Sequence, residues 1–223
     1  MSVRLNKYIA QSTGLSRRTA DTAIEDGRVL VNGQAPQAGQ QIQEADRVTL
    51  DGKPVEPTTS TQTILLNKPV GYIVSRTGQG GRTIYDLLPA PVRHLKPVGR
   101  LDKNSSGLLL LTNDGDLAAE LTHPKFQKVK IYEISLSKPL APLHRQMISD
   151  FGISLEDGLS QLGLERLQDG DELRWRVTMH EGRNRQIRRT FQALGYEVKR
   201  LHRTHFGNYN LPNDLEFGRY ITL

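Results

Sequence analysis

The stretch VGRLDKNSSGLLLLT, residues 98–112, decides how the larger part of this chain is organised. Leu108–Leu111 is apolar at every position, a pattern typical of a strand that is buried on both faces. The polar loop before it is bounded by Gly99 and Gly107 and carries one carboxylate, Asp102. The sequence therefore predicts a central strand with a single carboxylate presented at its start, although Asp102 alone could also be an ordinary turn residue.

Other short apolar patterns surround this strand. Tyr132, Ile134 and Leu136 alternate with polar residues, as expected for a strand with one buried face. Helices do not alternate regularly with strands, so the fold class is expected to be α+β rather than a doubly wound sheet. We expect strands over residues 63–66, 71–74, 108–111, 131–136 and 173–179, and helices over residues 116–121 and 183–194.

The N-terminal part differs in charge and in pattern. Residues 1–56 carry seven Lys/Arg and seven Asp/Glu, so they are neutral overall. Two short helices are expected, the second with Ser16 as its N-cap, followed by two strands and the tight-turn pair Asn32-Gly33. So small a domain is more suited to binding than to catalysis.

A linker separates the two parts. Residues 51–62, DGKPVEPTTSTQ, hold one aliphatic residue and two prolines and cannot form a core. We therefore divide the chain into a first domain over residues 1–56, a linker over residues 57–62 and a second domain over residues 63–223.

The net charge of +6 lies wholly in the second domain, with nine Lys/Arg and two Glu in residues 174–205. On the helix expected there, Arg185 and Arg189 point away from the apolar stripe, whereas Arg188 lies at its margin. Such a segment is often only a solvated helix face. The excess of arginine nevertheless favours an anionic partner, RNA or DNA, for which Arg185 and Arg189 could contact phosphates.

Several classes of site find no support in the sequence. The chain has no cysteine, which removes disulfides and thiol nucleophiles. An EF-hand-like spacing after Asp102 ends in Asn113, where calcium would need a bidentate Glu. No phosphate-binding loop or dinucleotide fingerprint is present. We therefore expect no metal and no nucleotide cofactor, and, since no apolar run is long enough to span a membrane, a cytoplasmic protein.

The sequence as a whole resembles a known enzyme family. Residues 98–115 resemble the signature of ribosomal RNA pseudouridine synthases. Five further segments resemble parts of these enzymes and occur in the expected order. Two of them resemble the opening of an S4-type RNA-binding domain, and three resemble later synthase motifs. These segments are residues 4–10 and 16–20, and residues 130–133, 181–189 and 195–201. The resemblance is to the subfamily that acts on single sites of small- or large-subunit ribosomal RNA.

The resemblance implies a mixed, mainly antiparallel sheet and a set of catalytic residues. Asp102 would be the nucleophile that isomerises a flipped-out uridine, attacking either the ribose C1′ or the uracil C6. Tyr132 would stack on the base or help remove the C5 proton. Arg188 would pair with Asp102 and keep it ionised, and Leu201 would line the uracil pocket. Without the resemblance, Tyr132 and Leu201 would be ordinary core residues.

The resemblance also implies ribosomal RNA, in the form of a structured stem-loop, as the partner. Arg100 would help hold the flipped nucleotide. The RNA backbone would be bound by six further cations, namely Lys7, Arg17 and Arg18 in the first domain and Arg183, Arg185 and Arg189 in the second.

Three hypotheses remain at this stage: an RNA-uridine isomerase acting by preference on large-subunit RNA, a non-catalytic RNA-binding or ribosome-assembly factor, and a protein that binds another polyanion. The carboxylate in an otherwise basic surface favours the first. The sequence leaves the target uridine open, and a monomer is expected.

Overall fold

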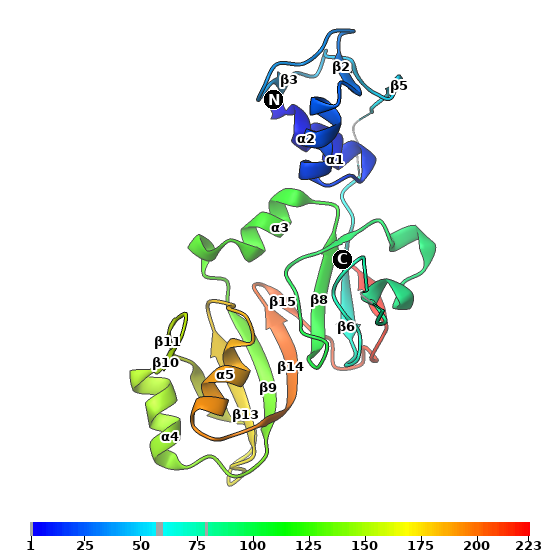
Figure 1. Cartoon of the computed structure of the whole chain (residues 1–223). Coiled ribbons are helices and arrows are strands. Elements are labelled where there is room, and N and C mark those ends of the chain that lie inside the picture. Colours follow the sequence, from blue (N-terminus) through cyan, green and yellow to red (C-terminus); the bar gives the residue numbers. More distant parts are fainter. Residues whose placement is uncertain (1, 57–59, 79) are drawn as a thin grey trace. The chain divides into compact units, whose positions relative to one another are not determined.

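The computed structural model describes residues 2–56, 60–78 and 80–223, and Figure 1 shows its ribbon. The chain forms two compact units, Met1–Gln62 with Asn113–Gly115, and Thr63–Thr112 with Asp116–Leu223. Each unit has its own buried core. Within the predicted linker, residues 57–59 lie outside the described residues. In the described ranges, no helix is both long and apolar enough to cross a membrane.

The smaller unit packs two helices against short strands. Its three-stranded antiparallel sheet has the order β2-β4-β5, and β1 pairs with β3. Apolar side chains from both helices and from the strands form one cluster, which includes Leu5, Ile9, Ala20 and Val29. The elements are β1 (Val3–Arg4), α1 (Leu5–Thr13), α2 (Arg17–Glu25), β2 (Val29–Val31), β3 (Gln41–Ile42), β4 (Val48–Leu50) and β5 (Lys53–Pro54).

Local signals set the ends of these helices and turns. The Ser16 hydroxyl accepts a hydrogen bond from the backbone N–H of Thr19 at 3.0 Å, which confirms the predicted N-cap of α2. Asn32 and Gly33 both have positive φ, 52° and 81°, as a two-residue hairpin turn requires. The expected helix pair and hairpin are therefore present.

The larger unit is built on one sheet with helices and loops around it. Its strands are β6 (Thr63–Lys68), β7 (Lys96–Pro97), β8 (Ser106–Thr112), β9 (Lys130–Leu136), β10 (Ile153–Leu155), β11 (Gly158–Ser160), β12 (Gly163–Arg166), β13 (Arg174–Met179), β14 (Val198–Phe206), β15 (Tyr209–Asn210) and β16 (Tyr220–Thr222). Its helices are α3 (Gly115–Thr122), α4 (Pro142–Gln146) and α5 (Gln186–Ala193), with short turns η1 (Ile84–Leu87), η2 (Ala90–Val92), η3 (Pro124–Phe126) and η4 (Met147–Phe151).

The main sheet has the order β12-β13-β9-β14-β8-β6-β16, with β15 beside β14 and β7 beside β8. The β14–β8 pair is parallel, and the other pairs of this sheet are antiparallel. The expected α+β class with a mixed, mainly antiparallel sheet is confirmed. All seven residues of β8 are buried, so the strand predicted from Leu108–Leu111 is central, as expected.

Gly107 explains how β8 and β14 approach each other. It pairs with Arg203 and has a φ of 101°, a conformation that other residues rarely adopt. A Cβ atom added at Gly107 would lie 2.2 Å from the carbonyl oxygen of Arg203. The glycine that bounds the Asp102 loop is therefore required where the loop enters the sheet.

Two of the expected elements differ from the structure. Residues 71–74 form no strand but a single bridge between Ile73 and Thr83, because Gly71 has a φ of 90° and turns the chain. The helix expected from residue 183 begins only at Gln186, since Arg185 has a left-handed backbone with a φ of 48°.

Helix α5 covers the face of the sheet on which the buried residues of β9, β13 and β14 lie (Figure 1). Ile187 and Phe191 pack into the same cluster as Tyr132, Trp175 and Leu201. This packing fixes the N-terminal turn of α5 at the end of the sheet where the Asp102 loop enters β8.

Candidate active site

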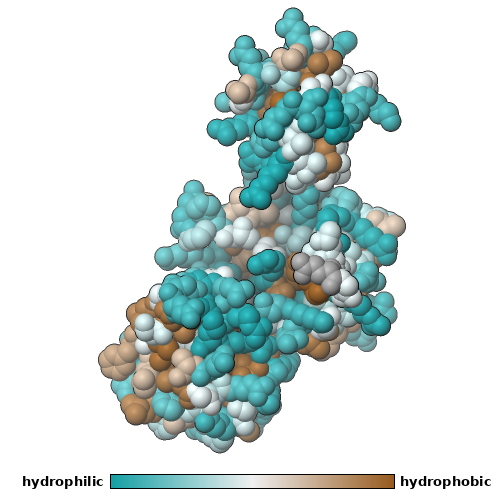
Figure 2. Space-filling model, viewed as in Figure 1, coloured by the Kyte–Doolittle hydropathy of each residue, from teal (hydrophilic) through white to brown (hydrophobic). Residues whose placement is uncertain are grey.

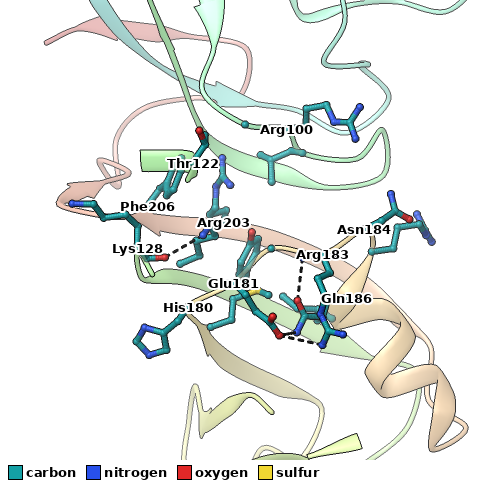
Figure 3. A pocket seen from close by; sticks show the side chains of 18 of the residues that line it. Arg100, Thr122, Lys128, His180, Glu181, Arg183, Asn184, Gln186, Arg203 and Phe206 are labelled. Atoms are coloured by element: carbon teal, nitrogen blue, oxygen red, sulfur yellow. Dashed lines mark hydrogen bonds and ion pairs between the residues drawn. The ribbon is translucent and has the colours of Figure 1, made fainter. Parts of the chain in front are cut away.

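A pocket of about 890 Å³ opens in the larger unit. Its lining comes from the Asp102 loop, the segment around η3, β9, the end of β13, the turn before α5 and β14. Figure 3 shows that Phe206, Arg203 and Lys128 lie together at one side of it, and that Glu181, Arg183 and Gln186 are joined at another. The candidate site therefore combines elements that are far apart in the sequence.

Asp102 lies in the lining of this pocket, with its side chain 35% exposed. Its backbone carbonyl accepts hydrogen bonds from the N–H of Ser105 at 3.0 Å and from the Lys68 ammonium at 3.1 Å. The carboxylate oxygen Oδ2 lies 3.7 Å from Nη1 of Arg185. The loop is thus held through its backbone while the carboxylate is left open to the pocket.

Lys68 holds this loop from inside the protein. Its side chain is fully buried at the end of β6, and its Nζ donates to the carbonyl oxygens of Pro69, Asp102 and Ser105 at 3.0, 3.1 and 2.8 Å. Burial lowers the pKa of the Lys68 ammonium to about 8, and the negative charge of Asp102 opposes that shift. Three carbonyl groups therefore share one buried cation, which fixes the backbone of the loop.

The predicted ion pair between Arg188 and Asp102 is absent among the described residues. Arg185 lies within ion-pairing distance of the Asp102 carboxylate instead. The Arg188 guanidinium donates to the carbonyl oxygens of Val198 at 2.6 Å and Asn104 at 2.8 Å. Its position at the margin of the helix directs it to backbone oxygens of the loop and of β14. Burial, and then the nearby charge of Arg185, lower the pKa of the Arg188 guanidinium.

Arg183 and Arg189 are bound to the β10–β11 hairpin. Both donate to the Asp157 carboxylate, Arg183 at 2.9 Å and Arg189 at 3.0 and 2.6 Å. Arg183 also donates to the carbonyl oxygens of Gly158 and Leu159. The side-chain hydrogen bond from Arg189 lowers the pKa of Asp157. These two arginines fasten a hairpin beside the pocket, and their contact with RNA stays a prediction.

The remaining expected site residues also line the pocket. Tyr132 and Leu201 are buried in its wall, and they pack in the main apolar cluster. Arg100 is exposed next to Leu101 and Asp102 and lines both this pocket and a smaller neighbouring one. The structure thus brings Arg100, Asp102, Tyr132, Arg185 and Leu201 to one cavity.

The surface around this pocket has one hydrophilic area and one hydrophobic area. On the face seen in Figure 2, hydrophilic side chains cover the region of α5, whereas hydrophobic ones gather around α4 and the β10–β11 hairpin. Leu143, Phe151 and Leu159 there are each at least 60% exposed. The hydrophilic cover is consistent with the cations of residues 183–189.

Comparison with known proteins accounts for this architecture. A family model described as RNA pseudouridylate synthase matches residues 62–193, more than half of the chain. The chain belongs to this family. A model of the S4 domain matches residues 3–48, so this pseudouridylate synthase homologue carries an S4 domain at its N-terminal side, as the resemblance implied.

Individual relatives agree with the assignment. An uncharacterized RNA pseudouridine synthase of Aquifex aeolicus (strain VF5) is 38% identical over 95% of this chain and 86% of its own length. The dual-specificity RNA pseudouridine synthase RluF of Escherichia coli (strain K12) is 39% identical over 94% of this chain and 72% of its own. A crystal structure of a pseudouridylate synthase superposes with a TM-score of 0.71 at 33% identity, covering 99% of this chain and 96% of the other.

Other relatives are longer than this chain. The ribosomal large subunit pseudouridine synthase B of Xanthomonas campestris pv. campestris is 36% identical over 99% of this chain, which spans only 47% of that relative's length. These comparisons show the family and the fold of the chain.

The predicted RNA-contacting cations of the S4 domain lie on its two helices. Arg17 and Arg18 are exposed at the start of α2, and Lys7 is half-buried on α1. The Arg17 guanidinium donates to the side-chain oxygen of Asn6 at 3.2 Å. These positions leave two exposed cations side by side in the sequence, and their contact with RNA stays a prediction.

Sequence reasoning missed three cations of the site: Lys68, Lys130 and Arg203. Lys68 follows an apolar run, and its burial depends on carbonyl groups that approach from a loop 34 residues away. Arg203 was counted in the basic segment, but nothing in the pattern separated it from the exposed arginines. In the described ranges, no group of three or more His, Asp or Glu side chains could hold a metal ion.

Proposed function

We propose that this protein isomerises a uridine of ribosomal RNA to pseudouridine, with Asp102 as the nucleophile. The observation that carries the proposal is the Asp102 carboxylate, which opens to the pocket from a loop that the buried Lys68 holds by its backbone. A carboxylate fixed in this way can add covalently to the substrate and leave again.

The reaction needs no external reagent because its atoms balance. The bond between the ribose C1′ and the uracil N1 breaks, the base rotates, and C1′ bonds to C5. The proton lost from C5 is matched by one gained at N1. The proposal is therefore a cofactor-free isomerisation, in which Asp102 attacks either the ribose C1′ or the uracil C6.

Other residues of the pocket have supporting roles in this proposal. Tyr132 stacks on the base or assists removal of the C5 proton, and Leu201 forms the apolar wall of the uracil site. Arg185 lies 3.7 Å from the carboxylate, where its positive charge faces the negative charge of Asp102. Arg188 acts one step away, since it holds the carbonyl of Asn104, two residues after Asp102.

The RNA has to present an unstacked uridine, which costs a few kcal/mol. Arg100 at the rim, Arg185 and the cations of the S4 domain would offset this cost by binding the backbone of a structured stem-loop. Several relatives are ribosomal large subunit pseudouridine synthases, which favours large-subunit (23S) RNA as the substrate. We also propose that the protein is a monomer and acts in the cytoplasm, where ribosomal RNA is modified.

The alternative is an RNA-binding or ribosome-assembly factor without catalytic activity. The carboxylate favours the enzyme, because a protein that only binds RNA gains nothing from a negative charge in a basic pocket. To separate the two, the purified chain is incubated with unmodified large- and small-subunit ribosomal RNA transcripts, and pseudouridine is mapped by carbodiimide treatment and primer extension.

We expect a new pseudouridine in the large-subunit transcript. RNA binding without pseudouridine in either transcript would contradict the enzyme and favour the assembly factor. Product in the small-subunit transcript alone would retain the reaction and overturn the choice of substrate.

A further inference from the structure

Lys130 and Arg203 form a pair of cations in the wall of the pocket, apart from Asp102 and Arg185. Arg203 on β14 pairs in register with Tyr132 on β9, and Phe206 pairs with Lys130. A register shift between Arg203 and His205 allows Phe206 to face the same side as Arg203. In Figure 3, Arg203 and Phe206 lie side by side in the pocket.

Arg203 is buried, with 2% of its surface exposed, and has few partners for so polar a group. Its Nε donates to the carbonyl oxygen of Leu108 at 2.9 Å, while Nη2 is buried without a hydrogen-bond partner. Among the residues that the structure describes, no carboxylate lies within ion-pairing distance of Arg203. Burial of a guanidinium in this way is costly unless an anion completes it.

Lys130 lies next to this guanidinium. Both cations lie over the ring of Phe206, Lys130 Nζ at 5.3 Å and Arg203 Cζ at 4.7 Å from its centroid. The Lys130 ammonium donates to the carbonyl of Lys128 at 3.1 Å. Burial lowers the pKa of Lys130, the positive charge of Arg203 lowers it further, and the charge of Glu181 opposes both.

Two neighbouring, partly dehydrated cations repel each other, and an anion between them would remove that repulsion. A uracil carbonyl is neutral and would not compensate two positive charges, whereas a phosphate oxygen would accept charge-assisted hydrogen bonds from both. Arg203 lies on β14, which pairs with the start of β8 immediately after the Asp102 loop, and Lys130 lies on the neighbouring strand β9.

We propose that Lys130 and Arg203 form a binding site for a phosphodiester group of the RNA strand that carries the target uridine. This proposal rests on the proposed function, because it takes RNA as the ligand of the pocket. In this proposal Lys130 and Arg203 position the RNA backbone, and Tyr132 and Leu201 contact the base.

The test compares two minimal ligands, uridine 5′-monophosphate and uridine, by calorimetric titration of the full chain at constant ionic strength. We expect the monophosphate to bind about ten-fold more tightly than uridine, as a charge-assisted hydrogen bond to phosphate implies. Lys130→Gln is expected to weaken binding of the monophosphate about ten-fold and to change binding of uridine less than two-fold.

Lys125→Gln is the matched control, since Lys125 also lies over a phenylalanine ring, at 4.6 Å from that of Phe126, but outside the pocket lining. It should leave both affinities unchanged. The proposal is overturned if uridine and its monophosphate bind equally, if the wild-type chain binds neither, or if Lys130→Gln weakens both to the same extent, which would indicate a contact to the base. Failure to form pseudouridine would contradict the proposed function without changing this comparison.

Discussion

Two segments line the same pocket and hold their charges in opposite ways: the loop of residues 98–107 and the turn of residues 181–189. In the loop, a buried cation, Lys68, binds backbone carbonyls, and the Asp102 carboxylate stays open to the pocket. In the turn, two side chains are bound to the β10–β11 hairpin, because Arg183 and Arg189 both donate to the Asp157 carboxylate. The charge of Asp102 is therefore left available for a substrate, whereas the charges of Arg183 and Arg189 are paired with Asp157.

This difference shows that the availability of a charged group for a ligand depends on its partner in the structure. The number of charges nearby is a poorer guide. Residues 183–189 hold four arginines, of which the sequence pattern distinguished only Arg188, at the margin of the apolar stripe. In the structure two fasten a hairpin, one binds carbonyl oxygens, and one, Arg185, lies beside Asp102.

The largest effect is expected for Lys68→Met. The substitution leaves three carbonyl groups without their shared, buried donor, so the free energy of unfolding should fall by about 3 kcal/mol. Denaturant unfolding measures it. Lys103→Met, in the same loop but exposed, is the control and should change stability by less than about 0.5 kcal/mol. Equal effects of the two substitutions would show that Lys68 does not anchor the loop.

The next effect separates the arginines of the turn. Arg185→Gln should lower the single-turnover rate of pseudouridine formation about ten-fold, because it removes the cation nearest to the Asp102 carboxylate. Arg189→Gln should lower that rate less than three-fold, since Arg189 is bound to Asp157. A larger loss for Arg189 than for Arg185 would contradict this difference and support a contact between Arg189 and RNA.

The S4 domain provides a contrast in which exposed cations are expected to bind RNA directly. Replacing Arg17 and Arg18 together by Ala should reduce the slope of log affinity against log salt by up to about two. The measurement is RNA binding at several salt concentrations. A slope equal to that of the wild-type chain would remove this part of α2 from the RNA-contacting surface.

The smallest effect is the pH dependence of stability that Lys68 introduces. Its pKa is about 8 in the folded chain and near the ordinary 10.5 when unfolded, so the unfolded state binds more protons between these values. The contribution of Lys68 to the unfolding free energy should therefore rise with pH across this window, by about 1 kcal/mol from pH 8 to 9. The difference in unfolding free energy between wild type and Lys68→Met reports it, and a difference that falls with pH would contradict the burial of this cation.

The sequence was sufficient for features that depend on nearby residues. The apolar run Leu108–Leu111, the N-cap Ser16 and the alternation around Tyr132 each predicted an element that the structure contains. Asp102 could be singled out because glycines bound its loop and because residues 98–115 resemble a known signature. Such local patterns are read from one segment at a time.

Features that depend on tertiary contacts could not be predicted in the same way. The partner of Arg188 was misjudged because its helix begins later than expected and because the approach of β14 brings the carbonyl of Val198 within reach. The burial of Lys68 and Arg203 depends on strands and loops more than 30 residues away. No periodicity within their own segments indicates that burial.

The central claim, that the Asp102 carboxylate performs the isomerisation, is tested most directly by Asp102→Asn. The account predicts that pseudouridine formation, mapped on the ribosomal RNA transcript by carbodiimide treatment and primer extension, falls by more than about 1,000-fold. The melting temperature and the affinity for the transcript should equal those of the wild-type chain, because the loop is held by its backbone. A variant that forms pseudouridine at the wild-type rate would contradict the account.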